Sequence, residues 1–263
     1  EHGEFFDHNV HALRIVEHFE QRYAEFPGLN LTFEVREGIV KHSRDYDAAA
    51  YPQLSEYLLD LRPPLEAQLI DLTDEIAYST ADLDDGVEAR ILTREQVREE
   101  VPVFGRLYSE VERLFPTAPE KLKFNEALKR VLDRLVSDLI VNTRRRIEGA
   151  GVGSVDDVRR SRERLFAFSP EVEQERQEIK RFLYDNLYYS PMLRADKEQG
   201  EQVIAELFSF FMSAPEELPG GYQSKADEEP VYRVVCDYIA GMTDNYVQEQ
   251  HRRFCSGSRR VEA

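Results

Sequence analysis

The sequence reads LEAQLIDLTDEIAYSTADL over residues 65–83, directly after Pro63 and Pro64. Its apolar residues recur at helical spacing, and they are Leu65, Leu69, Leu72, Ile76 and Leu83. A stripe with this spacing is typical of a helix that packs one face against a core. Proline suits the start of a helix, because it lacks the N–H group that the first turn leaves unpaired. The stretch therefore predicts a long amphipathic helix that begins at Leu65.

The same helical periodicity continues on both sides of this stretch. Helix starts are predicted after Asp7, Thr32, Thr93 (with Gln96), Pro119, Ser154 and Ser169. Two further helical segments are predicted, one with its apolar residues over 203–211 and a last helix over 231–254. No segment alternates apolar and polar residues as a half-buried strand does. We expect an all-α fold, organised as a single domain over residues 1–263.

Two stretches interrupt the helical pattern. Residues 44–62 contain Asp, Ala, Tyr and Pro without a sustained period, which indicates a long loop. The glycine-rich residues 149–154 follow three arginines and suit a helix stop and a hinge. They lack the Lys-Ser or Lys-Thr of a phosphate-binding P-loop, so that motif is excluded.

Composition narrows the classes of protein. The 263 residues include 34 Lys and Arg against 51 Asp and Glu, a formal net charge of −17. So acidic a chain carries no strong signal for nucleic-acid binding, which needs clustered cations. No apolar run approaches the roughly 18 residues of a membrane span, so we expect no membrane partner. The two cysteines make no disulfide framework, which favours a reducing, cytoplasmic location.

Polar residues of the 65–83 helix offer a candidate site. Asp71, Asp74, Tyr78 and Asp82 lie three or four residues apart and share one helix face. Asp74 is turned about 200° from the apolar stripe. The face is either a solvated acidic surface, which spacing alone favours, or a cleft wall that presents a carboxylate to a hard cation such as Mg²⁺ or Mn²⁺.

Histidines and cations leave similar alternatives open. His8, His11 and His18 could share a helical face and bind zinc, but this spacing is common by chance, and a partly exposed helical surface is the favoured interpretation. Lys41 and Arg233 are either solvated or among the placed cations that an acidic protein needs to bind a polyphosphate.

Several ordered segments resemble the dGTPase-like deoxynucleoside triphosphate triphosphohydrolases of the HD-domain superfamily. The matching segments are 6–9, 13–16, 26–32, 36–42, 65–68, 74–78, 82–86, 182–188 and 237–244. They run in order over nearly the whole chain, which makes the resemblance far more specific than any single motif.

The resemblance implies a multi-helix HD-type bundle and a reaction. Members of the family hydrolyse a dNTP to the deoxynucleoside and triphosphate, with a divalent metal ion. By resemblance Asp74 is a metal ligand, and Tyr78 and Asp82 are substrate-binding. Lys41 is similar to a lysine that contacts phosphate, and Asn9 and Arg233 match positions near the nucleotide. This implication favours the cleft interpretation of the Asp74 face. A homo-oligomer and a nucleotide activator are further expectations from the family.

One departure limits these expectations. The family's His and His-Asp metal ligands, and its catalytic His and Glu, precede the motif that begins here at Phe6. No catalytic residue is therefore assigned within this chain, which resembles the larger downstream part of such a protein. We expect the complete gene product to be the hydrolase and this chain alone to be inactive. The alternatives are a non-catalytic helical module that senses dNTPs or forms oligomers, and a purely structural scaffold.

Overall fold

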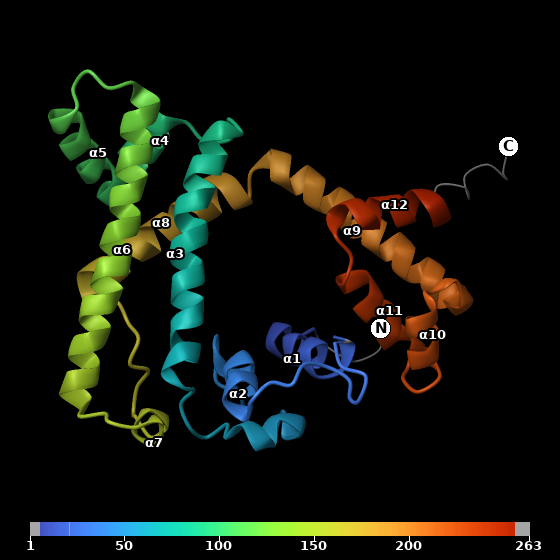
Figure 1. Cartoon of the computed structure of the whole chain (residues 1–263). Helices are drawn as coiled ribbons and strands as arrows, with labels where there is room; N and C mark the ends of the chain where they lie inside the picture. The colour runs from blue at the N-terminus through green and yellow to red at the C-terminus, as the bar shows by residue number, and fades with distance from the viewer. Residues whose placement is uncertain (1–5, 21, 256–263) are drawn as a thin grey trace, which may run out of the picture. The chain divides into compact units, whose positions relative to one another are not determined.

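The computed structural model describes residues 6–20 and 22–255, and its regular elements are helices (Figure 1). The chain divides into two compact units, Glu1–Leu187 and Tyr188–Ala263. The all-α prediction is confirmed. The division lies at residue 187, whereas the stretch predicted as a hinge, 149–154, lies inside the first unit. The single domain over residues 1–263 stays a prediction.

The first unit contains the longer helices. Its elements are α1 (His8–Arg14), the short π-helix η1 (Ile15–Phe19), α2 (Phe33–Lys41), the 3₁₀ helix η2 (Pro52–Tyr57), α3 (Leu65–Glu88), α4 (Arg94–Glu100), α5 (Pro102–Leu114), α6 (Glu120–Ala150), α7 (Val155–Arg159) and α8 (Pro170–Leu183). The short π-helix η3 (Tyr184–Tyr188) follows α8. The second unit contains α9 (Pro191–Ser213), η4 (Pro215–Glu217), α10 (Gly220–Ala226), α11 (Val231–Ala240) and α12 (Asp244–Phe254).

The helix α3 begins at Leu65, as predicted, and it organises the first unit. It packs against α2, α6 and α8, and it runs beside α6 in Figure 1. Ile76 and Leu83 of the predicted stripe are buried, whereas Leu65, Leu69 and Leu72 are only partly buried. The buried face also includes small and polar residues, which are Ala67, Gln68, Ser79 and Gly86. Gly86 lets Leu92 pack closely against α3, because an added Cβ would come within 2.7 Å of a Leu92 methyl group.

Local sequence signals account for most helix starts. The side chains of Asp7, Thr93 and Ser154 each accept a hydrogen bond from a backbone N–H group of the helix that follows, so these three predicted caps are confirmed. Thr32 and Ser169 directly precede α2 and α8, but their side chains make no capping hydrogen bond.

Three predicted boundaries are wrong. The 44–62 loop contains η2, because Leu54 and Tyr57 are three residues apart and both are buried. The helix α6 continues past Gly149 and ends where Gly151 adopts a left-handed conformation with φ +64°. The predicted 231–254 helix is two helices, since Gly241 ends α11 and the Thr243 side chain caps α12.

The second unit has a core of its own. The helices α11 and α12 both pack against α9. Leu207, Phe211, Val234 and Val235 are fully buried at the centre of this cluster. Across both units, none of the described helices is long and apolar enough to cross a bilayer.

Candidate functional site

A pocket of about 480 Å³ lies where the N-terminus of α1, the C-terminus of α2 and the first turns of α3 meet. It is lined by Phe6, Asp7, His8, Asn9, His42, Ser43, Arg44, Ile70, Asp71 and Asp74. Two of the predicted site residues, Asn9 and Asp74, are therefore brought to the same pocket from segments more than 60 residues apart. His8, His42 and Arg44 provide nitrogen groups, and Asp71 and Asp74 provide carboxylates.

The α1 side of the pocket is held by Asp7. Its Oδ1 caps α1 through the N–H groups of Asn9 and Val10, and it also accepts a hydrogen bond of 2.8 Å from the Tyr46 hydroxyl. The other carboxylate oxygen forms an ion pair with Arg44. Asp7 therefore holds the loop that follows α2 against the start of α1.

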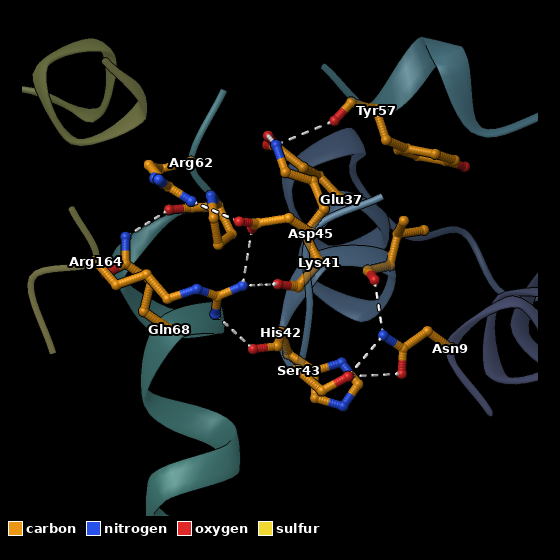
Figure 2. A network of polar contacts seen from close by, with 12 residues as sticks. Asn9, Glu37, Lys41, His42, Ser43, Asp45, Tyr57, Arg62, Gln68 and Arg164 are labelled. Carbon is orange, nitrogen blue, oxygen red and sulfur yellow. Dashed lines mark hydrogen bonds and ion pairs between the residues drawn. The ribbon is translucent and has the colours of Figure 1, made fainter. Parts of the chain in front are cut away.

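Asn9 is buried and joins α1 to the end of α2 (Figure 2). Its Nδ2 donates to the Val40 carbonyl and to Ser43 Oγ, both at 2.9 Å. Both amide hydrogens are thus used within the protein. Asn9 positions a pocket wall, and its predicted contact with a nucleotide stays a prediction.

Lys41 lies in a buried ionic network beside the pocket (Figure 2). Its ammonium donates to Glu37 Oε1 at 3.0 Å and to the carbonyls of Tyr57 and Leu58 at 3.2 and 2.8 Å. Arg159 donates to the second Glu37 oxygen at 2.6 Å. Burial lowers the pKa of Lys41, although the Glu37 carboxylate opposes this shift. All three ammonium hydrogens have acceptors here, and the predicted phosphate contact of Lys41 remains a prediction.

His42 directs one ring nitrogen towards the pocket. Its Nδ1 lies 2.9 Å from the Ile39 carbonyl, so this nitrogen carries the hydrogen and Nε2 is left for other partners. Nε2 lies 3.9 Å from Asp71 Oδ1. Arg164 donates to the backbone carbonyls of His42 and Lys41, at 2.7 and 3.1 Å, which holds the end of α2 in place (Figure 2).

The remaining predicted residues of α3 lie beyond the pocket. Tyr78 is half-buried, and burial, together with the nearby Glu75 carboxylate, raises its pKa to about 12. Glu75 pairs with Arg176 and with Lys180 of α8, so Tyr78 stands at an ionic contact between α3 and α8. Asp82 follows one turn later and is also partly buried.

Arg233 is on α11 in the second unit, whereas the residues that line the pocket all belong to the first unit. Sequence reasoning named Asp71 but missed His42 as a member of the site. A signal for His42 was available, because it directly follows Lys41 at the end of a predicted helix. The roles predicted for Asp74, Tyr78, Asp82 and Arg233 stay predictions.

The described residues contain no cluster of three or more His, Cys, Asp and Glu side chains that could hold a metal ion. Asp74 is exposed on the pocket wall and offers one carboxylate. The nearby Asp71 and His42 do not complete a metal centre with it. The donor set of the described residues therefore does not fit a metal ion by itself.

Comparison with known proteins defines the family. Residues 166–253 match the family model of a phosphohydrolase-associated domain. A "Deoxyguanosinetriphosphate triphosphohydrolase-like protein" of Bordetella pertussis is 41% identical over 249 residues, which are 94% of this chain and 64% of the relative. The chain belongs to the deoxyguanosinetriphosphate triphosphohydrolase-like family.

Other members of this triphosphohydrolase-like family match just as extensively. The relative from Thiobacillus denitrificans is 41% identical over 96% of this chain and 66% of its own length. The relative from Geobacter sulfurreducens is 36% identical over 97% of this chain and 66% of its own length. The chain thus spans about two-thirds of the length of the relatives it matches, which confirms the predicted resemblance and its extent.

Proposed function

We propose that this chain is part of a metal-dependent phosphohydrolase that converts a deoxynucleoside triphosphate, dGTP or several dNTPs, to the deoxynucleoside and triphosphate. The observation that carries the proposal is the match to triphosphohydrolase-like proteins over at least 94% of the chain. The pocket that contains Asp74 supports it, because carboxylate and imidazole groups from three helices converge there.

Each predicted residue has a role in the proposal. Asp74 is a ligand of the divalent ion, Mg²⁺ or Mn²⁺, since carboxylate oxygens suit both ions. Tyr78 and Asp82, on the same helix, bind the substrate. Lys41 and Asn9 hold the end of α2 beside the pocket, and Arg233 lies near the nucleotide.

The metal ion needs more ligands than the described residues supply. When bound, it would polarise the α-phosphate and activate a water molecule. The described residues offer Asp74 and do not complete a centre around it. We therefore propose that the chain alone is inactive and that the further ligands belong to the complete gene product.

Turnover of dGTP by the chain and by the complete gene product tests this proposal. We expect triphosphate release by the complete product with Mg²⁺ or Mn²⁺, its loss in Asp74→Asn, and little effect of Asp85→Asn. Asp85 is a matched control, because it is an exposed aspartate of the same helix that lies outside the pocket. Stoichiometric metal and robust turnover in the chain alone would refute the proposed inactivity.

The alternative is a non-catalytic module that senses dNTPs or forms oligomers, and the incomplete donor set favours it for the chain in isolation. This module would bind dGTP without hydrolysis in every context, including the complete gene product. We further propose that the protein forms a homo-oligomer in the cytoplasm. We also propose that a nucleotide activates it. Sedimentation of the protein without dNTPs tests whether it forms a homo-oligomer. Sedimentation with dNTPs tests whether a nucleotide changes the assembly.

A further inference from the structure

A second pocket, of about 550 Å³, lies where α6 ends and α7 begins. It is lined by Arg146, Gly149, Ala150, Gly151, Val152, Asp157, Arg160, Ser161, Arg162, Glu163 and Leu165. Its volume falls within the range of small-molecule sites in proteins. It shares no lining residue with the pocket that contains Asp74.

Three arginines border this second pocket in a chain of net charge −17. The side chains of Arg160 and Arg162 are exposed, and neither forms a hydrogen bond or an ion pair with a residue that the structure describes. Arg146 donates to Glu163 at 3.1 Å and to the Arg164 carbonyl at 2.9 Å, while its Nε is buried without a partner. The guanidinium groups of Arg160 and Arg162 are therefore the donors that a ligand in the pocket can reach.

The carboxylates of the pocket are already used. Asp157 accepts hydrogen bonds from Ser154 Oγ at 2.8 Å and from the Gly153 N–H at 3.1 Å, and these bonds lower its pKa. Glu163 pairs with Arg146. Arg160 interacts with Asp157 through its charge alone, and neither carboxylate forms an ion pair with Arg160 or Arg162, so both guanidinium groups keep their hydrogen-bond donors for an anion.

Part of the pocket wall is bare backbone. A Cβ atom added to Gly149 or Gly151 would meet no other atom within 4 Å, so both glycines face open space. Gly151 has a φ of +64°, the left-handed conformation that glycine adopts without strain. The absent side chains leave this wall of the pocket open, so a ligand can reach the arginines from this side.

We propose that this pocket binds a small polyanion with two or more phosphate groups, held by Arg160 and Arg162. Guanidinium groups match phosphate oxygens in geometry and charge. The phosphate groups could belong to free polyphosphate or to a nucleotide, and the two share the chemistry that the arginines recognise. This site is separate from the one proposed for hydrolysis and does not depend on it.

The segment that carries these arginines also supports the first pocket. Arg159 donates to Glu37 of α2. Arg164 donates to the carbonyls of Lys41 and His42 (Figure 2). The Leu165 N–H donates to Gln68 of α3 at 2.6 Å. A polyanion that orders residues 159–165 therefore also stabilises the end of α2, where His42 lines the first pocket.

Calorimetric titration of the chain with sodium tripolyphosphate tests the site. We expect binding that weakens as salt increases, and a loss of at least about tenfold in affinity in Arg160→Gln/Arg162→Gln, because two charge-assisted contacts are removed. The matched control is Arg194→Gln/Arg252→Gln, which removes two exposed arginines of the second unit with no ion pair to a described residue. Equal affinity of the wild type and the Arg160/Arg162 variant would overturn the proposal.

The source of the phosphates is distinguished by titrating tripolyphosphate, dGTP with EDTA, and deoxyguanosine. Binding of tripolyphosphate and dGTP that both weaken in the Arg160/Arg162 variant supports a site for polyphosphate in either form. Loss of tripolyphosphate binding alone identifies free polyphosphate as the ligand. Deoxyguanosine binding that depends on these arginines would overturn the polyanion proposal. No turnover is measured, so failure here leaves the proposed hydrolase untouched.

Hydrogen exchange tests the link to the first pocket. Tripolyphosphate is expected to slow exchange of the backbone amides of His42 and Ser43 in the wild type, but not in the Arg160/Arg162 variant. Arg164→Gln should retain tripolyphosphate binding and lose this protection, because the bonds to α2 are removed. Unchanged exchange at His42 and Ser43 in the saturated wild type would overturn the link.

Discussion

The substitution Glu37→Gln would test the ionic network that holds α2. Glu37 is fully buried, and its two oxygens accept hydrogen bonds from Lys41 at 3.0 Å and Arg159 at 2.6 Å. Glutamine has nearly the same size but no charge. The change therefore leaves the ammonium of Lys41, which is only 2% exposed, and the guanidinium of Arg159 without their shared counter-ion.

Loss of one partner of a buried ion pair costs about 3–5 kcal/mol of unfolding free energy. The lower end applies here, because Arg159 keeps an interaction with Asp156 at 3.8 Å and Lys41 keeps two carbonyl acceptors. At about 2–4 °C per kcal/mol for a unit of this size, a loss of about 3 kcal/mol lowers Tm by roughly 6–12 °C.

Urea unfolding followed by circular dichroism measures this loss. Glu99→Gln is the matched control, because Glu99 is exposed and unpaired among the described residues, and we expect it to change stability by less than about 0.5 kcal/mol. In the Glu37→Gln background, Lys41→Met should restore about 1–2 kcal/mol by removing the orphaned ammonium. A loss below about 1 kcal/mol for Glu37→Gln would refute the reasoning, since exposed pairs contribute that little.

Three further variants probe other parts of the first unit. Asn9→Ala should cost about 1–3 kcal/mol and speed amide exchange at Ser43, because the Val40 carbonyl loses its buried donor; unchanged exchange at Ser43 would argue against the role of Asn9. Leu83→Ala should cost about 2–5 kcal/mol in urea unfolding, as Leu83 is 0% exposed, and a cost below about 1 kcal/mol would contradict its place in the core. The pKa of Tyr78 is raised from 10.0 to about 12, so between these pH values the folded chain keeps a proton that the unfolded chain loses. The protonated Tyr78 therefore contributes to the free energy of unfolding below pH 10, and this stabilisation is lost as the pH rises from 10 to 12. Tyr78→Phe should therefore show a shallower fall in stability over that range, and an identical fall would refute the assignment.

Local patterns predicted the elements that depend on nearby residues. The start of α3 followed from Pro63, Pro64 and the apolar spacing, and the position of Asp74 on the pocket wall agrees with its angle of about 200° from the stripe. Asp7 was predicted as a cap because a side-chain acceptor before a helical pattern satisfies the first turn.

Features that depend on distant contacts were not predictable in this way. His42 is held by Arg164, which is 122 residues away in sequence. Lys41 is surrounded by backbone carbonyls of Tyr57 and Leu58, and no sequence pattern indicates the left-handed conformation of Leu58, with φ 50°. A charged residue at the end of a short helix is usually solvated, so the burial of Lys41 emerges only from tertiary structure.

The most direct test of the proposed function is the ³¹P NMR spectrum of the products that the complete gene product forms from dGTP with Mg²⁺. The proposal predicts deoxyguanosine together with the doublet and triplet of tripolyphosphate, and no product signals with Asp74→Asn. Pyrophosphate or orthophosphate as the phosphorus product, or full turnover by the Asp74→Asn variant, would contradict it.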